Sequence, residues 1–265
     1  VRAMKDLSIE LGVKINYNSP VEKINVNDQG IVKSILVNGK EISTDIVLSG
    51  ADYNHTEKLL PSKYKQYSDK YWEKKKFAPS SLLFYVGFNK KVENVCHHTL
   101  FFDSEFDKHA ESIYDTPEWP SDPLFYASFP SQTDDTFAPQ GKEAATFLIP
   151  IAIDLEDTEE LRDKYFDIIL SRLEKLTGQS VKDDVLFVKS YCVKDFVKDY
   201  NSYGGNAYGL ANTLKQTAFL RPKIRSKKVN NLFFTGQLTV PGPGVPPSLI
   251  SGKIASESIK KHFEI

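Results

Sequence analysis

The sequence predicts an α/β part that is interrupted by an inserted α+β part. Two apolar runs far apart in the chain, 45–49 and 231–235, have the pattern of strands buried on both faces of a parallel sheet. Between them, strand-like runs occur in series with helices to one side, which is typical of an α+β unit. We therefore assign residues 1–52 and 206–265 to the first part, and residues 53–205 to an inserted mixed-sheet part.

The composition excludes several classes of protein. The 265 residues are 40% hydrophobic, which is ample for a buried core. A net charge of −1 predicts no nucleic-acid partner. Cys96 and Cys192 are far apart, so neither a disulfide framework nor a metal site is expected, and a reducing cytoplasm fits best. No apolar run approaches the roughly 20 residues that span a bilayer.

The first fifty residues predict a helix followed by a β-meander. One face of that helix carries Val1, Met4, Leu7 and Leu11. Gly12 is suited to end the helix. Because the helix begins at the first residue, which is not methionine, we expect the chain to be a piece of a longer polypeptide. Alternating runs follow at 13–16, 21–26, 31–37 and 41–48, and Asn38-Gly39 between two of them predicts a hairpin.

The middle and the end of the chain supply the remaining elements. Helices are expected at 56–76 and 158–177, and strands at 81–88, 99–102, 124–129, 145–153 and 185–191. Asp157 and Glu160 resemble a capping box for the second of these helices. A buried strand at 231–236 and a final helix at 247–262 close the chain.

A proline- and glycine-rich loop precedes the final helix. No GxGxxG motif is present, and residues 242–247 depart from it at the third glycine, which argues against a pyrophosphate-binding turn there. Gly242 and Gly244 allow the backbone to approach another group closely. Pro247 suits the first helical position, and the helix then carries small residues. Two interpretations stay open: a helix N-terminus aimed at an anionic ligand, or a tightly packed structural helix.

Five stretches of the chain resemble the bacterial-type phytoene desaturases and related carotenoid oxidoreductases, which belong to the amine-oxidase-like flavoproteins. The stretches are 11–24 (LGVKINYNSPVEKI), 96–102 (CHHTLFF), 195–210, 217–222 and 231–259, which contains PGPGVPP. They occur in the family's order and cover essentially the whole chain as the C-terminal half of a protein about twice as long. The resemblance implies that the first part is the C-terminal portion of an FAD-binding Rossmann-like domain.

The resemblance also implies a set of FAD-binding residues. Val21 would meet the adenine, and Gly50 and Ala51 would lie near the dinucleotide. The pyrophosphate and the ring would be surrounded by Gly236, Gln237, Gly244, Val245 and Pro246. Gln237 departs from the related flavoproteins, which often carry Ala, Asp or Glu there. The glycines of the family's dinucleotide-binding turn have no counterpart in this sequence.

The implied reaction is FAD-dependent desaturation of a C40 carotenoid, such as phytoene or a hydroxylated carotene, in a dry apolar slot. The alternatives are a related saturase, isomerase or amine oxidase, or a non-catalytic lipid-binding fragment. No catalytic residue is identified. His97 and His98 would point to opposite faces of a strand and could not chelate one metal, so a structural or surface role is favoured over that of a base.

Two further groups of residues suggest how a polyene is bound. Aromatic residues that could line a tunnel, or form an ordinary core, are Phe84, Tyr85, Phe88, Phe101, Phe102, Phe125, Tyr126 and Phe129. Where the family's chain passes between substrate and flavin lie Tyr200, Tyr203 and Tyr208, with Gly204, Gly205 and Gly209.

A membrane surface is the expected source of such a substrate. Seven lysines lie at positions 58, 63, 65, 70, 74, 75 and 76, among the aromatic residues Tyr64, Tyr67, Tyr71, Trp72 and Phe77. A basic helix with aromatic anchors suits the interface of an anionic bilayer, whereas a solvated helix face is the alternative. We expect a cytoplasmic protein, peripherally associated with the inner face of the cell membrane. We also expect this half to be inactive and poorly soluble without its N-terminal half.

Overall fold

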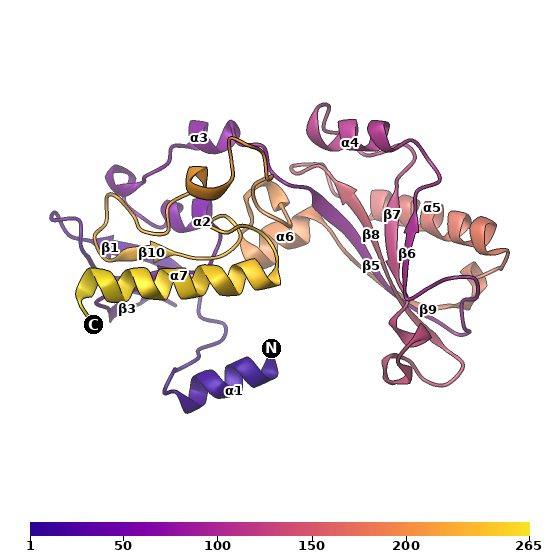
Figure 1. The fold of residues 1–265 in the computed structure, drawn as a ribbon, viewed down its shortest axis with the longest axis horizontal. Helices are drawn as coiled ribbons and strands as arrows, with labels where there is room; N and C mark the ends of the chain where they lie inside the picture. Colours follow the sequence, from indigo (N-terminus) through magenta and orange to yellow (C-terminus); the bar gives the residue numbers. More distant parts are fainter.

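A computed structural model describes all 265 residues and shows two bodies side by side (Figure 1). One body holds a three-stranded sheet, a two-stranded sheet and the long C-terminal helix α7 (Val245–Phe263). The other holds a five-stranded sheet with helix α5 (Glu159–Thr177). Helix α6 (Val193–Tyr200) lies at the junction. No helix combines the length and the apolar character needed to cross a membrane.

The three-stranded sheet is the predicted meander. It consists of β1 (Val21–Val26), β2 (Val32–Val37) and β3 (Lys40–Ser43), paired antiparallel in that order. Asn38 and Gly39 both have positive φ, 49° and 70°, as a two-residue hairpin turn requires. The prediction of a strand at 13–16 is wrong. That segment has no strand partner and follows helix α1 (Arg2–Glu10), none of whose residues is buried.

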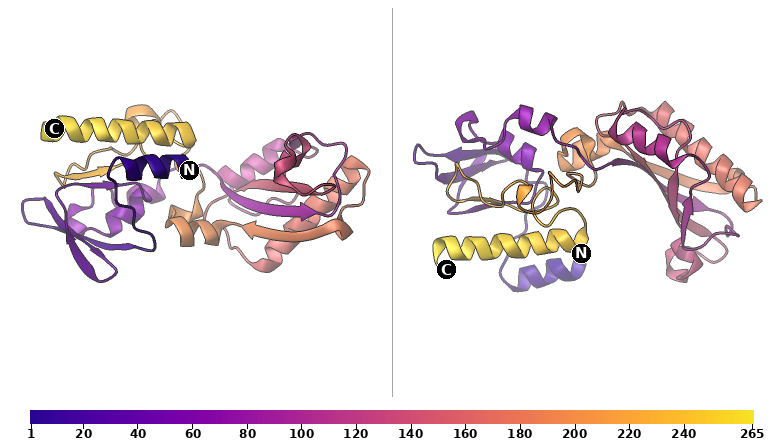
Figure 2. Two further views of the ribbon diagram at one scale, coloured as in Figure 1. Left: turned by 90° about the horizontal axis from the view of Figure 1, so that it is seen from below. Right: turned by 45° about the horizontal axis from the view of Figure 1, so that its top comes forward.

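The two-stranded sheet joins segments from opposite ends of the chain. Strand β4 (Val47–Ser49) pairs in parallel with β10 (Leu232–Phe234). They belong to the body that carries the yellow C-terminal helix in both views of Figure 2. The prediction of burial on both faces is confirmed for β10, whose three residues are all buried. It is wrong for β4, where Leu48 is 43% exposed, because β4 is an edge strand with no second neighbour.

The lysine- and tyrosine-rich segment after β4 is not one helix. It contains α2 (Tyr53–Lys58), a 3₁₀ turn (Ser62–Tyr64) and α3 (Asp69–Glu73). Pro61 interrupts the helical pattern, and Ser68 caps α3 by accepting a hydrogen bond from the Tyr71 N–H. The segment also packs in one core with residues of β1, β2 and β10, so the first body includes residues that the sequence assigned to the inserted part.

The five-stranded sheet is antiparallel throughout, which corrects the expectation of a mixed sheet. Its order is β6 (His98–Phe101), β7 (Phe125–Ser128), β8 (Glu143–Ile151), β5 (Ser80–Phe88) and β9 (Val185–Tyr191). Helix α5 packs on one face, where it forms the largest apolar core with the inward side chains of four strands. The cap of α5 is Thr158 and not Asp157, because the Thr158 hydroxyl accepts from the Leu161 N–H.

Several short elements were not predicted. Helix α4 (Phe106–Tyr114) lies at the top of the five-stranded sheet in Figure 1, and α6 follows β9 directly. Further 3₁₀ turns occur at Pro130–Gln132, Asp135–Phe137, Lys182–Asp184, Tyr203–Gly205 and Ala218–Leu220. The 3₁₀ turns are too short for a hydrophobic period to identify them.

Candidate functional site

The largest cavity lies where the two parallel strands of the first body end. The carboxyl ends of β4 and β10 meet at one edge, and ligands of open α/β sheets bind in the crevice outside such ends. The cavity has a volume of about 730 Å³. Its lining comprises Gly50, Ala51, Asp52, Phe196, Asp199, Tyr200, Asn201, Ser202, Asn206, Ala207, Thr235, Gly236, Gln237, Leu238 and Ser248.

The structure brings four of the eight proposed FAD-binding residues into this lining: Gly50, Ala51, Gly236 and Gln237. Gly236 has φ of 100°, a conformation that L side chains rarely adopt, so its backbone meets the cavity without a side chain. Val21 lies elsewhere, at the start of β1 against the core of the first body. Gly244, Val245 and Pro246 do not line the cavity, but they immediately precede Ser248, which does.

The N-terminus of α7 faces the cavity through Ser248, so its positive dipole end is available to an anion. Its cap, Gly244, supplies no side-chain hydrogen bond. Pro246 and Pro247 have no N–H group, and the Ser248 N–H is bonded to the Gly244 carbonyl at 2.9 Å. Val245 therefore contributes the one free N–H donor of the first turn. The N-terminus of α7 would attract an anion through its dipole more than through hydrogen bonds from N–H groups.

Ser251 fixes α7 against the end of β10. Its buried hydroxyl oxygen accepts the Gly236 N–H at 2.9 Å and lies 2.7 Å from the Thr235 hydroxyl. This contact explains why the helix needs small residues on that face. Both interpretations of the loop therefore apply, because α7 is tightly packed and its N-terminus lies at a cavity.

Gln237 makes a contact that the sequence left undetermined. Asn206 is 1% exposed, and its amide is oriented by two backbone groups: Oδ1 accepts the Gly209 N–H at 2.8 Å, and Nδ2 donates to the Tyr203 carbonyl at 2.8 Å. The Gln237 Nε2 donates to the same Asn206 oxygen at 3.3 Å. The Gln237 amide is thereby oriented, and its Oε1 is free to accept a hydrogen bond from a ligand.

Arg221 is a buried cation behind the cavity that sequence reasoning did not single out. It is 2% exposed and has no carboxylate partner. It donates to the carbonyls of Gln237 and Leu210, both at 3.1 Å, and its Nε has no partner. Burial lowers the pKa of the guanidinium. An arginine directly before a proline, after an apolar run, was the available signal.

The Asp52 carboxylate lines the cavity and bonds to chain segments on two sides of it. It follows β4, and its Oδ1 accepts the His55 N–H at 3.1 Å while its Oδ2 accepts the Tyr203 N–H at 3.2 Å. Burial raises the pKa of this carboxyl above its usual value, and these two hydrogen bonds oppose the increase. Asp52 therefore anchors the returning segment of the chain to the strand end.

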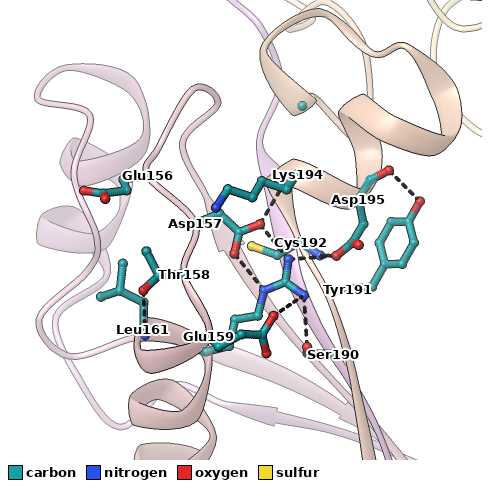
Figure 3. Close-up of polar contacts among 12 residues, drawn as sticks. Glu156, Asp157, Thr158, Glu159, Leu161, Ser190, Tyr191, Cys192, Lys194 and Asp195 are labelled. Carbon is teal, nitrogen blue, oxygen red and sulfur yellow. Dashed lines mark hydrogen bonds and ion pairs between the residues drawn. The ribbon is translucent and has the colours of Figure 1, made fainter.

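Helix α6 forms the wall of the cavity that faces the five-stranded sheet, and a buried ion network holds its N-terminus (Figure 3). Arg162 of α5 donates to both oxygens of Asp157, each at 2.7 Å, and to Asp195 Oδ2 at 2.8 Å. Asp195 in turn accepts the Cys192 N–H at 2.9 Å and completes a capping box on α6. Burial alone would raise the pKa of Asp157, but hydrogen bonds from Arg162 and from the Lys194 N–H hold it below its usual value.

The prediction that His97 and His98 point to opposite faces of one strand is wrong. His97 precedes strand β6, so the alternation of a strand does not separate it from His98, and the ring centroids lie 4.2 Å apart. His97 Nδ1 bonds to the Thr133 hydroxyl at 2.7 Å, and His98 Nδ1 bonds to the Tyr126 hydroxyl. Neither residue lines the large cavity, and no group of three or more potential metal ligands converges in the structure.

The predicted aromatic tunnel residues divide between two faces. Phe84, Phe88, Phe101, Phe125 and Phe129 belong to the core under α5. Tyr85 and Tyr126 lie on the opposite, open face of the sheet, and Phe102 is 60% exposed. Of the tyrosines in the later group, Tyr200 lines the large cavity, Tyr203 stacks on Phe77 and Tyr208 is exposed.

Comparison with known proteins decides the family. The family model described as flavin containing amine oxidoreductase matches residues 1–260. The chain belongs to this family. The resemblance to FAD-dependent carotenoid oxidoreductases is confirmed by the relatives described next, and FAD is the cofactor of this group.

The chain is similar to curated carotenoid desaturases along nearly its full length. It is 42% identical to a carotenoid 3,4-desaturase of Haloarcula japonica over 98% of this chain and 52% of that protein. It is 30% identical to a zeta-carotene-forming phytoene desaturase of Myxococcus xanthus over 97% of this chain and 50% of that protein. The chain thus spans about half the length of the curated relatives it matches. An oxidoreductase from Methanosarcina mazei has the same fold, with a TM-score of 0.64 at 16% identity over 97% of this chain and 53% of that one.

Proposed function

We propose that this chain is the C-terminal half of an FAD-dependent desaturase that removes hydrogen from a carbon–carbon bond of a C40 carotenoid, such as phytoene or a hydroxylated carotene. The observation that carries the proposal is the large cavity at the ends of β4 and β10, in a chain 42% identical to a carotenoid 3,4-desaturase. We assign residues 1–52 and 206–265, with the segment 53–77 that packs on them, to the FAD-binding domain. The five-stranded sheet is the substrate domain.

The residues around the cavity fit a dinucleotide. Its volume lies within the range of ligand pockets, and the strand ends present glycine backbone where a phosphate or a ring must come close. Gly50 and Gly236 would hold the phosphate region, and the dipole of α7 would favour negative charge beside Ser248. When bound, FAD supplies the two-electron oxidant that the removal of hydrogen needs. Gln237 would orient the ligand through its free Oε1.

An apolar row on the open face of the five-stranded sheet would hold the polyene. The strand register aligns Leu100, Tyr126, Leu148, Leu83 and Tyr191 across all five strands, on the face opposite α5. The hydroxyl of Tyr191, at one end, bonds to Asp199 of the cofactor cavity at 3.0 Å. Such a row excludes water along a hydrocarbon chain and requires no acid–base pair along its length.

Two experiments test the desaturase proposal. The complete protein should copurify with FAD and show the visible absorption of a flavin. Incubation with phytoene or a hydroxylated carotene in liposomes should give a product with additional conjugated double bonds. A colourless protein that binds lipid would support the non-catalytic alternative. With flavin present, a product with fewer double bonds would support a saturase, and a product with rearranged double bonds would support an isomerase. Oxidation of an added amine, with no change in the carotenoid, would support an amine oxidase instead.

We also propose two partners. The first is the N-terminal half of the same polypeptide, which would pair with the open edge of β4 and cover its exposed Leu48. The second is the inner face of the cell membrane in the cytoplasm. Three of the five predicted aromatic anchors, Tyr64, Trp72 and Phe77, are buried, and the other two, Tyr67 and Tyr71, are partly buried against the same core.

The membrane contact would therefore be mainly electrostatic. Lys58, Lys70 and Lys74 are exposed and without an ion pair, and each lysine near an anionic surface contributes about 1 kcal/mol. Replacing Lys58, Lys70 and Lys74 by glutamine should weaken cosedimentation with anionic liposomes, and added salt should remove the difference. Equal binding by the wild type and the variant at low salt would refute this contact.

A further inference from the structure

A second cavity lies between α4 and the outer strands of the five-stranded sheet. It has a volume of about 270 Å³ and shares no lining residue with the cofactor cavity. Apolar side chains dominate its walls, among them Phe102, Phe106, Ala110, Ile113 and Leu124. No step of the proposed reaction uses this site.

Of the three side chains with polar groups in this lining, His109 and Tyr126 are already paired with the protein, and Tyr114 is 38% exposed. His109 is 5% exposed, its Nε2 donates to the Pro150 carbonyl at 2.7 Å, and its Nδ1 accepts the Leu124 N–H at 2.9 Å. The Tyr126 hydroxyl is bonded to His98. Away from the Tyr114 hydroxyl, a ligand that carried a hydroxyl or a charge into the cavity would lose its bonds to water and gain none from the protein, which is unfavourable. The cavity therefore favours plain hydrocarbon.

The cavity also lies at the far end of the apolar row. Leu100 and Tyr126 both line it and begin the row, whose other end, Tyr191, bonds to Asp199 of the cofactor cavity. Four steps between strands of about 4.8 Å place these ends roughly 19 Å apart. An elongated hydrocarbon that crosses the sheet from the cofactor would thus arrive at the second cavity.

We infer that the cavity under α4 binds one unfunctionalised hydrocarbon terminus of the substrate. This inference rests on the proposed function and adds to it a determinant of specificity. About 270 Å³ is slightly below the range of pockets that enclose a whole ligand, so the site takes an end and not the entire chain. Phe102 and Phe106, 60% and 63% exposed, flank the site. A membrane acyl chain has the same chemistry, and the experiment separates the two sources.

The binding test uses a fluorescent hydrocarbon polyene, diphenylhexatriene, with the complete protein in dilute detergent. Ala110→Trp fills the cavity from within α4, and Asp107→Trp places the same side chain on an exposed position of the same helix. Phe106→Ser removes a lining aromatic that is exposed, so it leaves the core intact. We expect Ala110→Trp to weaken binding at least about tenfold, Phe106→Ser to weaken it measurably, and Asp107→Trp to change it less than about twofold.

Competition and kinetics complete the test. Squalene should displace the probe, and a diol of similar length with a hydroxyl at each end should displace it at least about tenfold less well. In liposomes, Ala110→Trp should raise KM for phytoene with little change in kcat or in liposome binding. Equal weakening by Asp107→Trp, equal competition by the diol, or a loss of liposome binding with unchanged KM would each overturn the inference. If the wild type binds the probe as expected but desaturates nothing, the proposed function fails and the hydrocarbon site stands.

Discussion

Arg162 provides the sharpest test of how the proposed cofactor cavity is held in shape. Its side chain is 8% exposed, and that of its partner Asp157 is 0% exposed. Replacing Arg162 by methionine keeps the volume of the side chain but leaves a buried carboxylate without its cation. Removing one partner of a buried pair costs about 3–5 kcal/mol, because the remaining charge is uncompensated. We expect a loss of unfolding free energy of that size.

A double-mutant cycle separates the charge effect from lost packing. Asp157→Asn keeps an oxygen for the Lys194 N–H, which bonds to Asp157 at 2.9 Å. The combination with Arg162→Met should be less destabilised than the sum of the two single variants by about 1–3 kcal/mol. Ser190→Ala is the matched control. It removes one 3.0 Å bond to Arg162 and should cost no more than about 1 kcal/mol.

Urea unfolding of the complete protein measures these free energies, with the FAD dissociation constant as a second quantity. Because Arg162 also holds Asp195, the cap of α6, we expect Arg162→Met to weaken FAD binding through the α6 wall. If Arg162→Met lowers the free energy of unfolding by less than about 1 kcal/mol, the reasoning is contradicted, because an unpaired buried carboxylate destabilises the fold by more than that. Strictly additive changes in unfolding free energy across the double-mutant cycle would also contradict it.

Three further predictions concern other buried polar groups. Burial raises the pKa of Glu57 to about 7, so its contribution to the free energy of unfolding is complete below pH 4.5 and is lost as pH rises through 7. Glu57→Gln should remove up to about 3 kcal/mol of this decline in unfolding free energy, measured by urea unfolding at several pH values. Burial lowers the pKa of His109 from 6.5, so wild-type stability should fall as pH drops below 6.5, and His109→Gln should flatten that slope in the same assay. Asn206→Ala frees the Gln237 amide to rotate and should weaken FAD binding about three- to tenfold by titration, whereas an unchanged affinity would show that Gln237 does not touch the cofactor.

Much of the fold followed from short-range signals. The Asn38-Gly39 turn, the periodicity of α5 and the apolar run of β10 each depend on neighbours in sequence, and each was predicted correctly. The prediction of a single helix at 56–76 was wrong, because a contact between residues nine and ten positions apart determines how this segment folds. Glu57 accepts N–H groups of Gln66 and Tyr67 and so folds the chain back after Pro61. Periodicity cannot detect such a contact.

The candidate site residues were named only through the family resemblance. The structure places the glycines at the ends of β4 and β10 in the lining of the large cavity, where bare backbone allows a ligand to come close. Tyr200 of α6 was also named through the resemblance, whereas Asn206, Arg221 and the other wall residues of α6 were not, since they reach the cavity from segments that no local pattern connects. The histidines were misjudged for a similar reason: whether His97 belongs to β6 depends on where pairing with β7 stops.

Tyr191 connects the two cavities with the network that supports α6. Its position in β9 places it at the end of the apolar row, beside Leu83, while its hydroxyl donates to the Asp195 carbonyl at 3.1 Å and to Asp199. The same Asp195 receives Arg162 from α5, the helix that packs on the other face of the sheet. The orientation of the sheet relative to the cofactor cavity therefore depends on one buried charge cluster, not on apolar packing alone. Since hydrogen transfer tolerates little misplacement, a change at Arg162 that spares all lining residues should still lower kcat.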